Sequence, residues 1–168
     1  MIALYHGTNQ AFHTIDLQRG LPNKDFGRGF YLTDSFECAV KTARQRVDRL
    51  GGAAKVLTFE LDEEKLSMLN VKRFAAPSRE WALFVRANRR DYVDADDHNR
   101  DNRYDLVIGP IANDKLSLQF RLFDKGIISL DDFVDGLKFR QVYMQYSFHT
   151  IRAVESLELG EVNDVDVG

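Results

Sequence analysis

Apolar and polar residues along this chain fall into short patterned segments, several with the period of two that is typical of β-strands. The segment 55–61 alternates cleanly, which predicts a strand with one face in water. The run at 2–5 is apolar and predicts a buried strand ending at His6, whereas 29–33 is rich in strand-favouring aromatic residues. Two more strands are expected at 106–108 and 142–148.

Between the predicted strands, apolar residues recur at helical spacing. Asp34 or Ser35 is expected to cap a helix that runs to about Leu50, where two glycines stop it. Pro77-Ser78 predicts the start of a second helix, which places Trp81, Phe84 and Val85 on one apolar face. Further helices are expected at about 113–125, at 130–137 and after Thr150.

Short amphipathic strands that alternate with helices favour a mixed α+β domain. A doubly wound parallel sheet would instead need strands buried on both faces. The polar segment 7–27 contains glycine and proline and predicts a long loop. No repeat or low-complexity linker divides the chain. We therefore expect one domain over 1–157, followed by an acidic segment, 158–168, that forms an edge strand or a frayed tail.

Composition narrows the class of protein. With 168 residues, 12 Phe and 6 Tyr, the chain has enough apolar surface for a core that needs no disulfide or metal. No apolar run approaches the roughly 20 residues of a membrane span, so no membrane association is expected. The single Cys38 suits a reducing compartment, and the first residues do not have the pattern of a signal peptide. A cytoplasmic location is therefore expected.

The net charge is −3, which does not favour sequence-independent binding to nucleic acid but leaves room for a local basic nucleotide site. Neither of the standard glycine-rich phosphate motifs, GxGxxG after a strand or GxxxxGK[ST], occurs. The four histidines are scattered and the one cysteine has no partner, so no metal site is predicted. No GxSxG elbow indicates a nucleophilic serine.

Three polar clusters remain as candidates for chemistry. The first is His6-Gly7-Thr8, where the predicted buried strand opens into the loop. Gly7 would let a ligand approach the backbone closely, and the side chains of His6 and Thr8 offer hydrogen bonds. A strand-end histidine satisfied by the local backbone is the alternative interpretation.

The second cluster, 25–33, reads Asp-Phe-Gly-Arg-Gly-Phe-Tyr-Leu-Thr. Its two glycines would expose backbone amides, Lys24 and Arg28 could meet phosphate oxygens, and Tyr31 offers a flat face for a ring. A bulged hairpin with buried aromatic residues is the alternative. The third cluster is 145–150, where strand alternation puts Gln145 and Ser147 on one face. A glutamine that points into a cleft would hydrogen-bond a sugar hydroxyl, and a glutamine on a solvated face is the alternative.

Taken in order, the three clusters resemble the motifs of the ADP-ribosyltransferase superfamily, specifically its His-Tyr-Glu branch of diphtheria toxin and the poly-ADP-ribose polymerases. That branch has His-Gly-Ser/Thr at the end of its first strand, similar to 6–8, and a Gly-x-Gly-aliphatic-Tyr strand, similar to 27–31. Its third motif opens a late strand with an acidic residue, where this chain has Gln145. The chain is also similar to an uncharacterised bacterial family of the same fold group, most clearly at 104–114 and 145–150.

The resemblance implies a fold in which two small, mainly antiparallel sheets with flanking helices form a cleft that binds NAD. It implies an NAD-dependent mono-ADP-ribosyltransferase, of bacterial or phage origin, that modifies a macromolecular acceptor and releases nicotinamide. A toxin or conflict-system role with a small antitoxin protein as partner is implied as well. A protein acceptor is expected rather than a nucleic acid, because the net charge is −3.

The resemblance also assigns roles to single residues. His6, Tyr31 and Gln145 would be the catalytic residues. The NAD-binding residues would be His6, Gly7, Thr8, Lys24, Arg28, Gly29, Tyr31 and Thr33. The backbone of Gly7 would hold the nicotinamide carboxamide with help from Thr33 or Ser35, and Tyr31 would stack on the nicotinamide ring. His6 would bind a ribose hydroxyl, and Lys24 and Arg28 would bind the diphosphate.

Two departures from the branch qualify these roles. Gln145 is neutral, which favours single transfer over chain elongation or allows a loss of activity, and Asp114 or Glu155 could supply the missing carboxylate. Thr42 lies where polymerases carry a second stacking aromatic residue, a role open to Phe26, Phe30 or Phe36. Three other functions therefore stay open: a non-catalytic module that binds NAD or a partner, an NAD glycohydrolase, and removal of a 2′-phosphate from RNA.

Overall fold

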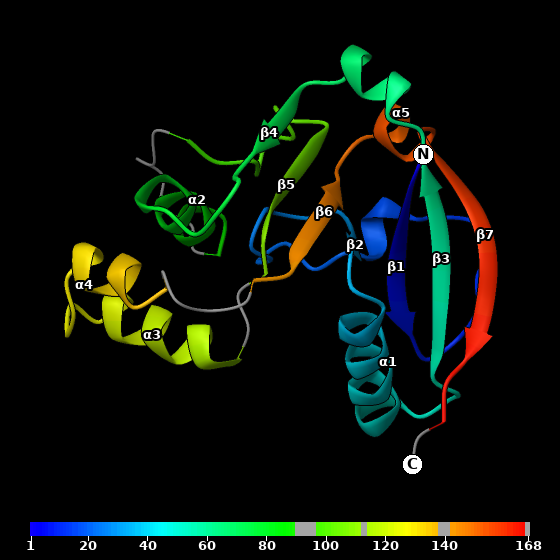
Figure 1. Cartoon of the computed structure of the whole chain (residues 1–168), viewed down its shortest axis with the longest axis horizontal. Helices are drawn as coiled ribbons and strands as arrows, with labels where there is room; N and C mark the ends of the chain where they lie inside the picture. The colour runs from blue at the N-terminus through cyan, green and yellow to red at the C-terminus, as the bar shows by residue number, and fades with distance from the viewer. Residues whose placement is uncertain (90–96, 112–113, 138–141, 167–168) are drawn as a thin grey trace.

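In the part of the chain that the computed structural model describes, residues 1–89, 97–111, 114–137 and 142–166, seven strands form one open sheet (Figure 1). The strand order is β4-β5-β6-β2-β1-β3-β7. Only β4 and β5 are parallel, and all other neighbours are antiparallel. The strands are β1 (Ile2–Thr8), β2 (Phe30–Thr33), β3 (Lys55–Leu61), β4 (Val71–Arg73), β5 (Leu106–Pro110), β6 (Met144–Phe148) and β7 (Leu157–Asp164).

The α+β class predicted from the sequence is confirmed, but the prediction of two separate sheets is wrong for this chain, because the strands form a single sheet. Its two halves are joined weakly. Between β1 and β2 only Tyr5 and Thr33 are paired, whereas β1 pairs with β3 along all seven of its residues. Beyond Tyr5 the strands separate, and the side chain of His6 bonds to the carbonyl of Tyr31 across the gap.

Helix α1 (Phe36–Leu50) lies along β1 and follows its sequence signals closely. The hydroxyl of Ser35 accepts a hydrogen bond from the Cys38 amide at 3.2 Å, which caps the first turn. Gly51 ends the helix with a φ of 72°, a conformation that glycine adopts at little cost. Ala39 and Ala43 form its buried stripe, and these small side chains allow the helix to lie close to the sheet.

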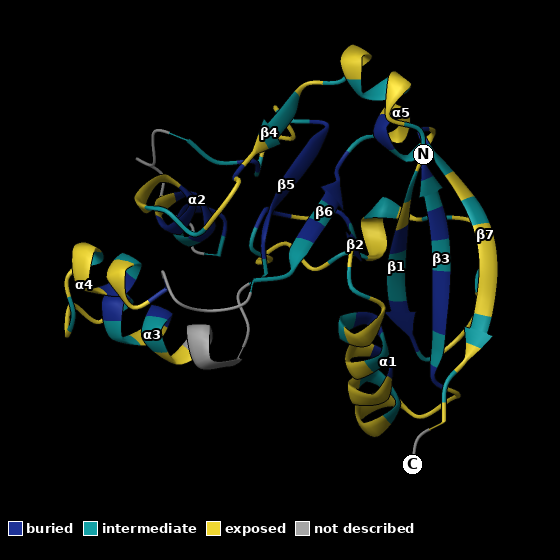
Figure 2. Cartoon of the chain, in the orientation of Figure 1, coloured by how far each residue is buried: buried dark blue, intermediate teal, exposed yellow. Residues whose placement is uncertain are grey.

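The other helices lie mainly on the opposite half of the sheet. They are α2 (Arg79–Arg89), α3 (Asp114–Asp124) and α4 (Leu130–Asp135), with the short α5 (Ile151–Val154) following β6. Trp81, Phe84 and Val85 are buried on one face of α2, as their spacing predicts, and they join the aromatic core of this half. Figure 2 shows buried and exposed stretches along α2. A second core of mainly aliphatic residues surrounds Leu4, Leu57 and Leu106. The long loop after β1 contains one 3₁₀ turn, η1 (Leu17–Arg19), and a second, η2 (Glu64–Met68), precedes β4.

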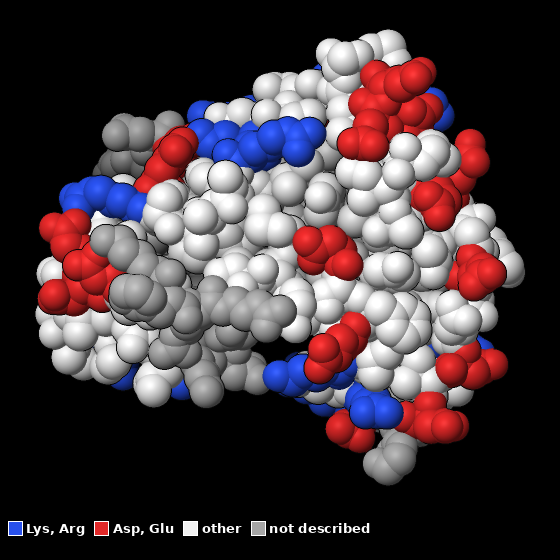
Figure 3. Space-filling view, in the orientation of Figure 1, with Lys and Arg blue, Asp and Glu red and all other residues white. Residues whose placement is uncertain are grey.

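The acidic C-terminal segment forms an edge strand and not a frayed tail, because β7 pairs with β3 from Leu157 to Asp164. In Figure 3, acidic side chains are spread along this edge, the most extended group of basic ones lies over β4, and smaller basic groups lie near α1 beside acidic ones. None of the helices formed by the described residues has the length and apolar character needed to cross a membrane.

Candidate functional site

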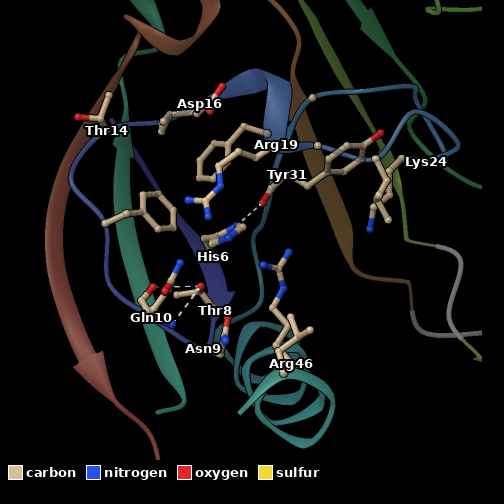
Figure 4. A pocket seen from close by; sticks show the side chains of 17 residues that line it. His6, Thr8, Asn9, Gln10, Thr14, Asp16, Arg19, Lys24, Tyr31 and Arg46 are labelled. Carbon is tan, nitrogen blue, oxygen red and sulfur yellow. Dashed lines mark hydrogen bonds between the residues drawn. The ribbon is translucent and has the colours of Figure 1, made fainter. Parts of the chain in front are cut away.

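Two adjoining cavities lie where β1 and β2 separate, and His6, Lys24, Tyr31 and Arg46 line both of them. The first, which we call the loop cavity, has a volume of about 370 Å³ and is enclosed by the segment that follows β1 (Figure 4). The second, the helix cavity, has a volume of about 380 Å³ and is bounded by α1, by β2 and by Gln145 of β6. The four shared residues form the neck between the two cavities.

His6 occupies the middle of this neck (Figure 4). Its Nδ1 lies 2.8 Å from the carbonyl oxygen of Tyr31, and since a carbonyl only accepts, Nδ1 carries the proton and donates. Burial lowers the pKa of His6 to about 4, so the ring is neutral near pH 7. Nε2 is therefore a hydrogen-bond acceptor on a residue that lines both cavities.

Tyr31 uses its hydroxyl inside the protein. The phenol donates to the carbonyl of Gly27 at 2.6 Å and accepts from the amide of Phe26 at 3.0 Å, which closes the loop that precedes β2. Burial raises the pKa of Tyr31, so the phenol stays protonated and able to donate. The ring lies nearly parallel to Phe26, and the Nζ atom of Lys24 lies 6.0 Å from its centroid. Only the ring of Tyr31 is left for a ligand.

Close packing explains two of the glycines in the sequence motifs. A Cβ atom on Gly7 would lie 2.0 Å from the carbonyl oxygen of Ala39, so Gly7 allows α1 to pack against β1. A Cβ atom on Gly29 would lie 2.7 Å from the carbonyl oxygen of Phe148 in β6. Both glycines also line a cavity, Gly7 the helix cavity and Gly29 the loop cavity. The two motif glycines therefore allow the elements that form the walls of the cleft to pack closely.

Lys24 and Arg46 place two cations at the neck. Burial lowers the pKa of both groups, and the charge of Arg46 lowers the pKa of Lys24 further. Within the described residues, neither side chain has a carboxylate within ion-pair distance, although the nearby charge of Asp25 partly offsets the effect on Lys24. Figure 4 shows the guanidinium of Arg46 reaching from α1 toward His6. Two partly desolvated cations whose charges repel each other are costly unless an anion joins them.

The cleft as a whole is basic, although the protein is acidic. Among the described residues, five basic side chains line the two cavities: Arg19, Lys24, Lys41, Arg46 and Arg89. Two acidic ones, Asp16 and Asp25, accompany them. On a chain with a net charge of −3, this concentration of positive charge favours an anionic ligand.

Gln145 lies on the wall of the helix cavity with its side chain almost fully buried. Its Nε2 donates to Asp25 Oδ2 at 2.9 Å and to the carbonyl of Pro110 at 3.0 Å. The other carboxylate oxygen of Asp25 binds Arg89, at 2.8 Å from Nε and 2.7 Å from Nη2. A carboxylate therefore lies beside Gln145, supplied by the loop before β2.

The remaining predicted site residues divide into two groups. Thr8 lines the loop cavity and Thr33 the helix cavity, and the hydroxyl of each is hydrogen-bonded to nearby backbone. Arg28 lines neither cavity, because its guanidinium donates to the carbonyl of Gln18 on the protein surface. Ser35 is used as the cap of α1 and also lies off both cavities.

The candidates for the second stacking aromatic residue and for the missing carboxylate lie in different parts of the fold. Of the three phenylalanines, Phe30 lines the loop cavity, whereas Phe26 belongs to the aromatic core and Phe36 is exposed beside Tyr5. Glu155 ends α5 and lines neither cavity. Asp114 begins α3, and its side chain lies outside the described part of the chain.

Several cleft residues were not singled out from the sequence. Arg46 follows Ala39 and Ala43 on the helix at spacings of seven and three, so it continues the stripe that faces β1, and this spacing was the available signal. Phe12 packs edge-on against His6 and Phe30 from within a polar loop, where no local pattern marks it. Arg89 at the end of α2 becomes part of the cleft only because the tertiary fold brings α2 to Asp25.

The described residues contain no group of three or more His, Cys, Asp or Glu side chains arranged to hold a metal ion. Comparison with curated proteins and with solved structures gives no match for this chain. A family of proteins of unknown function, DUF3990, matches residues 2–159, which is nearly the whole chain. The chain therefore belongs to the DUF3990 family.

Proposed function

We propose that the cleft binds NAD and that the protein transfers its ADP-ribose unit to a macromolecular acceptor. The observation that carries this proposal is the pair of unneutralised cations, Lys24 and Arg46, at the neck between two cavities. A dinucleotide has the complementary form, with a diphosphate between two ring-bearing halves. Each cavity also has the volume that is usual for part of a small-molecule site.

The side chains around the neck supply matching contacts in this proposal. Lys24 and Arg46 bind the diphosphate, which also relieves the repulsion between them. The Nε2 atom of neutral His6 accepts a hydrogen bond from a ribose hydroxyl. The ring of Tyr31 provides the flat surface for the nicotinamide, within the helix cavity that also holds Thr33 and Gln145.

The reaction needs few strong catalytic groups. The bond between the anomeric carbon and the nicotinamide nitrogen breaks, and its electron pair leaves with nicotinamide, which becomes neutral. A bond then forms from the anomeric carbon to a nucleophilic atom of the acceptor, whose proton passes to solvent. The protein holds NAD in place, excludes water and stabilises the cationic sugar, which are contributions of position and electrostatics.

The test starts with binding. Calorimetry of the purified protein with NAD is expected to show binding that weakens in Arg46→Ala and Lys24→Ala variants. Chromatography is expected to show release of nicotinamide, and incubation with labelled NAD and a cell lysate should give a labelled macromolecule. His6→Ala and Tyr31→Ala should abolish both products. If the wild type binds no NAD and the variants behave like it, the proposal is wrong.

A second candidate is a module that binds NAD without turning it over. The observation that favours it is Gln145, a neutral residue at the position where the His-Tyr-Glu branch, which this chain resembles, carries a carboxylate. NAD binding without release of nicotinamide, in the presence of lysate, would select this function over the transferase. Nicotinamide release with water as the only acceptor would instead indicate an NAD glycohydrolase.

A further inference from the structure

The wall of the helix cavity contains a three-residue polar network made by segments far apart in the sequence. Asp25 comes from the loop before β2, Arg89 from the end of α2 and Gln145 from β6. The carboxylate of Asp25 lies between the other two, with one oxygen on Arg89 and the other on Gln145. All three residues line the helix cavity, and the side chain of Asp25 is only 15% exposed.

Hydrogen bonding fixes the orientation of the Gln145 amide. Nε2 has two hydrogens, and both are directed at acceptors, Asp25 Oδ2 and the carbonyl of Pro110. Turning the amide over would place Oε1 against these two oxygens without a donor, which is strongly unfavourable for buried groups. Oε1 has no hydrogen-bond partner among the described residues. It is also not fully buried. It is therefore presented to the cavity as an acceptor.

Asp25 also brings negative charge to this acceptor. A carboxylate that receives a hydrogen bond from an amide NH₂ polarises the amide and increases the electron density on its oxygen. Arg89 holds Asp25 from the opposite side through its other oxygen, so the carboxylate stays fixed toward Gln145. Because the side chain of Asp25 is largely buried, water screens its charge less than it would on the surface, and the charge can act on a ligand at short range.

We infer that Asp25 is a positioning residue that orients and polarises Gln145, so that Asp25 and Gln145 together replace a single carboxylate at position 145. This inference rests on the proposed function. Gln145 Oε1 accepts a hydrogen bond from a hydroxyl of the nicotinamide ribose, and the charge of Asp25 stabilises the positive charge that develops on that sugar. The carboxylate thus comes from the motif before β2, and not from Asp114 or Glu155.

An exchange of charge between the two positions tests the inference. Asp25→Asn removes the charge, and because Arg89 attracts the remaining oxygen, the new amide NH₂ faces the NH₂ of Gln145. Gln145→Glu places a second carboxylate against Asp25. In the double variant Asp25→Asn/Gln145→Glu, the amide introduced at position 25 donates to the carboxylate introduced at position 145, which returns one negative charge to the wall. Asp34→Asn is the matched control, because Asp34 accepts from the backbone of Met144 and lines neither cavity.

The readouts are the steady-state kcat and KM for nicotinamide release, with folding of each variant checked by thermal unfolding. We expect each single variant to lower kcat by about 100-fold, the lower end of the 10²- to 10³-fold loss seen when one oriented polar group is removed from a transition-state site. KM for NAD should change by less than about threefold, because Lys24 and Arg46 remain in place. The double variant should recover at least about tenfold in kcat over either single variant.

Each other outcome has a distinct meaning. A folded Asp25→Asn protein with the kcat of the wild type, or a double variant no better than the single ones, overturns the role of Asp25. If Asp25→Asn does not fold, Gln145→Met removes the polarised oxygen while leaving similar volume, and an unchanged kcat in that variant overturns the role equally. A wild type that binds no NAD shows that the proposed function itself is wrong. NAD binding without nicotinamide release selects the binding module over the transferase and overturns the role of Asp25 together with the transferase.

Discussion

Two regions of this protein are built from the same types of polar residue and use them differently. The cleft contains Asp25 paired with Arg89, and His6. The corner at the start of β5, which we call the β5 corner, contains Asp105 paired with Arg152, and His149. Each aspartate is nearly buried, and each histidine donates Nδ1 to a backbone carbonyl at 2.8 Å. The difference lies in where the unused polar atoms are: Nε2 of His149 is enclosed in the corner without a partner among the described residues, whereas the unused atoms of the cleft lie at cavities.

In the β5 corner the carboxylate of Asp105 is saturated. It accepts from the backbone amide of Asn70 at 2.8 Å and from the hydroxyl of Thr150 at 2.7 Å, and Arg152 binds both of its oxygens. These bonds join the turn before β4, the start of β5 and the cap of α5. The corner therefore serves the fold.

The cleft leaves several of its groups available. His6 Nε2, Gln145 Oε1 and the cations of Lys24 and Arg46 line cavities and have no hydrogen-bond or ion-pair partner among the described residues. Such an arrangement costs stability and is retained where a ligand completes it. The comparison indicates that polar atoms left unused at a cavity, and not buried polar residues as such, mark the functional site.

The largest effect we expect is on the pH dependence of stability. Burial lowers the pKa of both His6 and His149 to about 4, below the value of about 6.5 in an unfolded chain. Between these values the unfolded state binds more protons, so stability falls as the pH is lowered from about 6.5 to about 4. The loss approaches about 3 kcal/mol for His149 and is smaller for His6, whose ring borders a cavity.

Urea unfolding at several pH values between 7 and 4 measures this loss. His149→Gln should flatten the dependence more than His6→Gln, because His149 is the more buried of the two. Equal slopes in the two variants would contradict the distinction between a closed corner and an open cleft.

The second effect separates stability from binding. Asp105→Ala should lower the free energy of unfolding by about 2–3 kcal/mol, since it leaves the part-buried donors of Asn70 and Thr150 without an acceptor. At a temperature where the variant remains folded, its NAD affinity should equal that of the wild type. Chemical denaturation and calorimetry together measure both quantities. A variant of normal stability would show that the corner does not hold these elements together.

The third effect is a loss of NAD affinity without a loss of stability. Arg46→Ala and Lys24→Ala should each weaken NAD binding by about 10- to 100-fold, which corresponds to about 1.4–2.8 kcal/mol. Their unfolding free energy without ligand should be unchanged or higher, because each substitution removes repulsion between partly desolvated cations. A loss of stability with unchanged affinity would place these residues with Asp105 as supports of the fold.

The smallest effect concerns Arg28. Its guanidinium is exposed and donates to the carbonyl of Gln18, away from both cavities. Arg28→Ala should change NAD affinity by less than about twofold and stability by less than about 0.5 kcal/mol. Calorimetry of the Arg28→Ala and Arg46→Ala variants with NAD compares an arginine suggested by the sequence motif with one found in the fold. A large loss of affinity in Arg28→Ala would restore the motif-based assignment.

The sequence predicts the elements whose signals are local. Ser35 and Gly51 bound α1 as expected, and the cap at Thr150 and the apolar face of α2 are also present. Strand β4 escaped prediction because its three residues are ordered by pairing with β5, more than 30 positions away. The single sheet was missed for a similar reason, since one residue pair between β1 and β2 decides whether there is one sheet or two.

For the site, the motifs located the centre but not the charges around it. His6 and Tyr31 belong to recognisable clusters and line both cavities. Arg46 resembles an ordinary surface arginine of an amphipathic helix until α1 is placed against β1. Asp25 belongs to the cluster at 25–33, yet its role depends on Gln145. That residue is 120 positions away and reaches Asp25 only in the folded sheet.

The strand order has a consequence for how the protein is made. Strand β6 sits between β5 and β2 near the centre of the sheet, although it is among the last strands to be synthesised. Until residues 144–148 leave the ribosome, β2 and β5 lack the neighbour that joins them, and their edges stay open to unwanted pairing. The same strand brings Gln145 to Asp25. A growing chain therefore joins the two halves of its sheet and completes its cleft in one late step, after which only the edge strand β7 remains to be added.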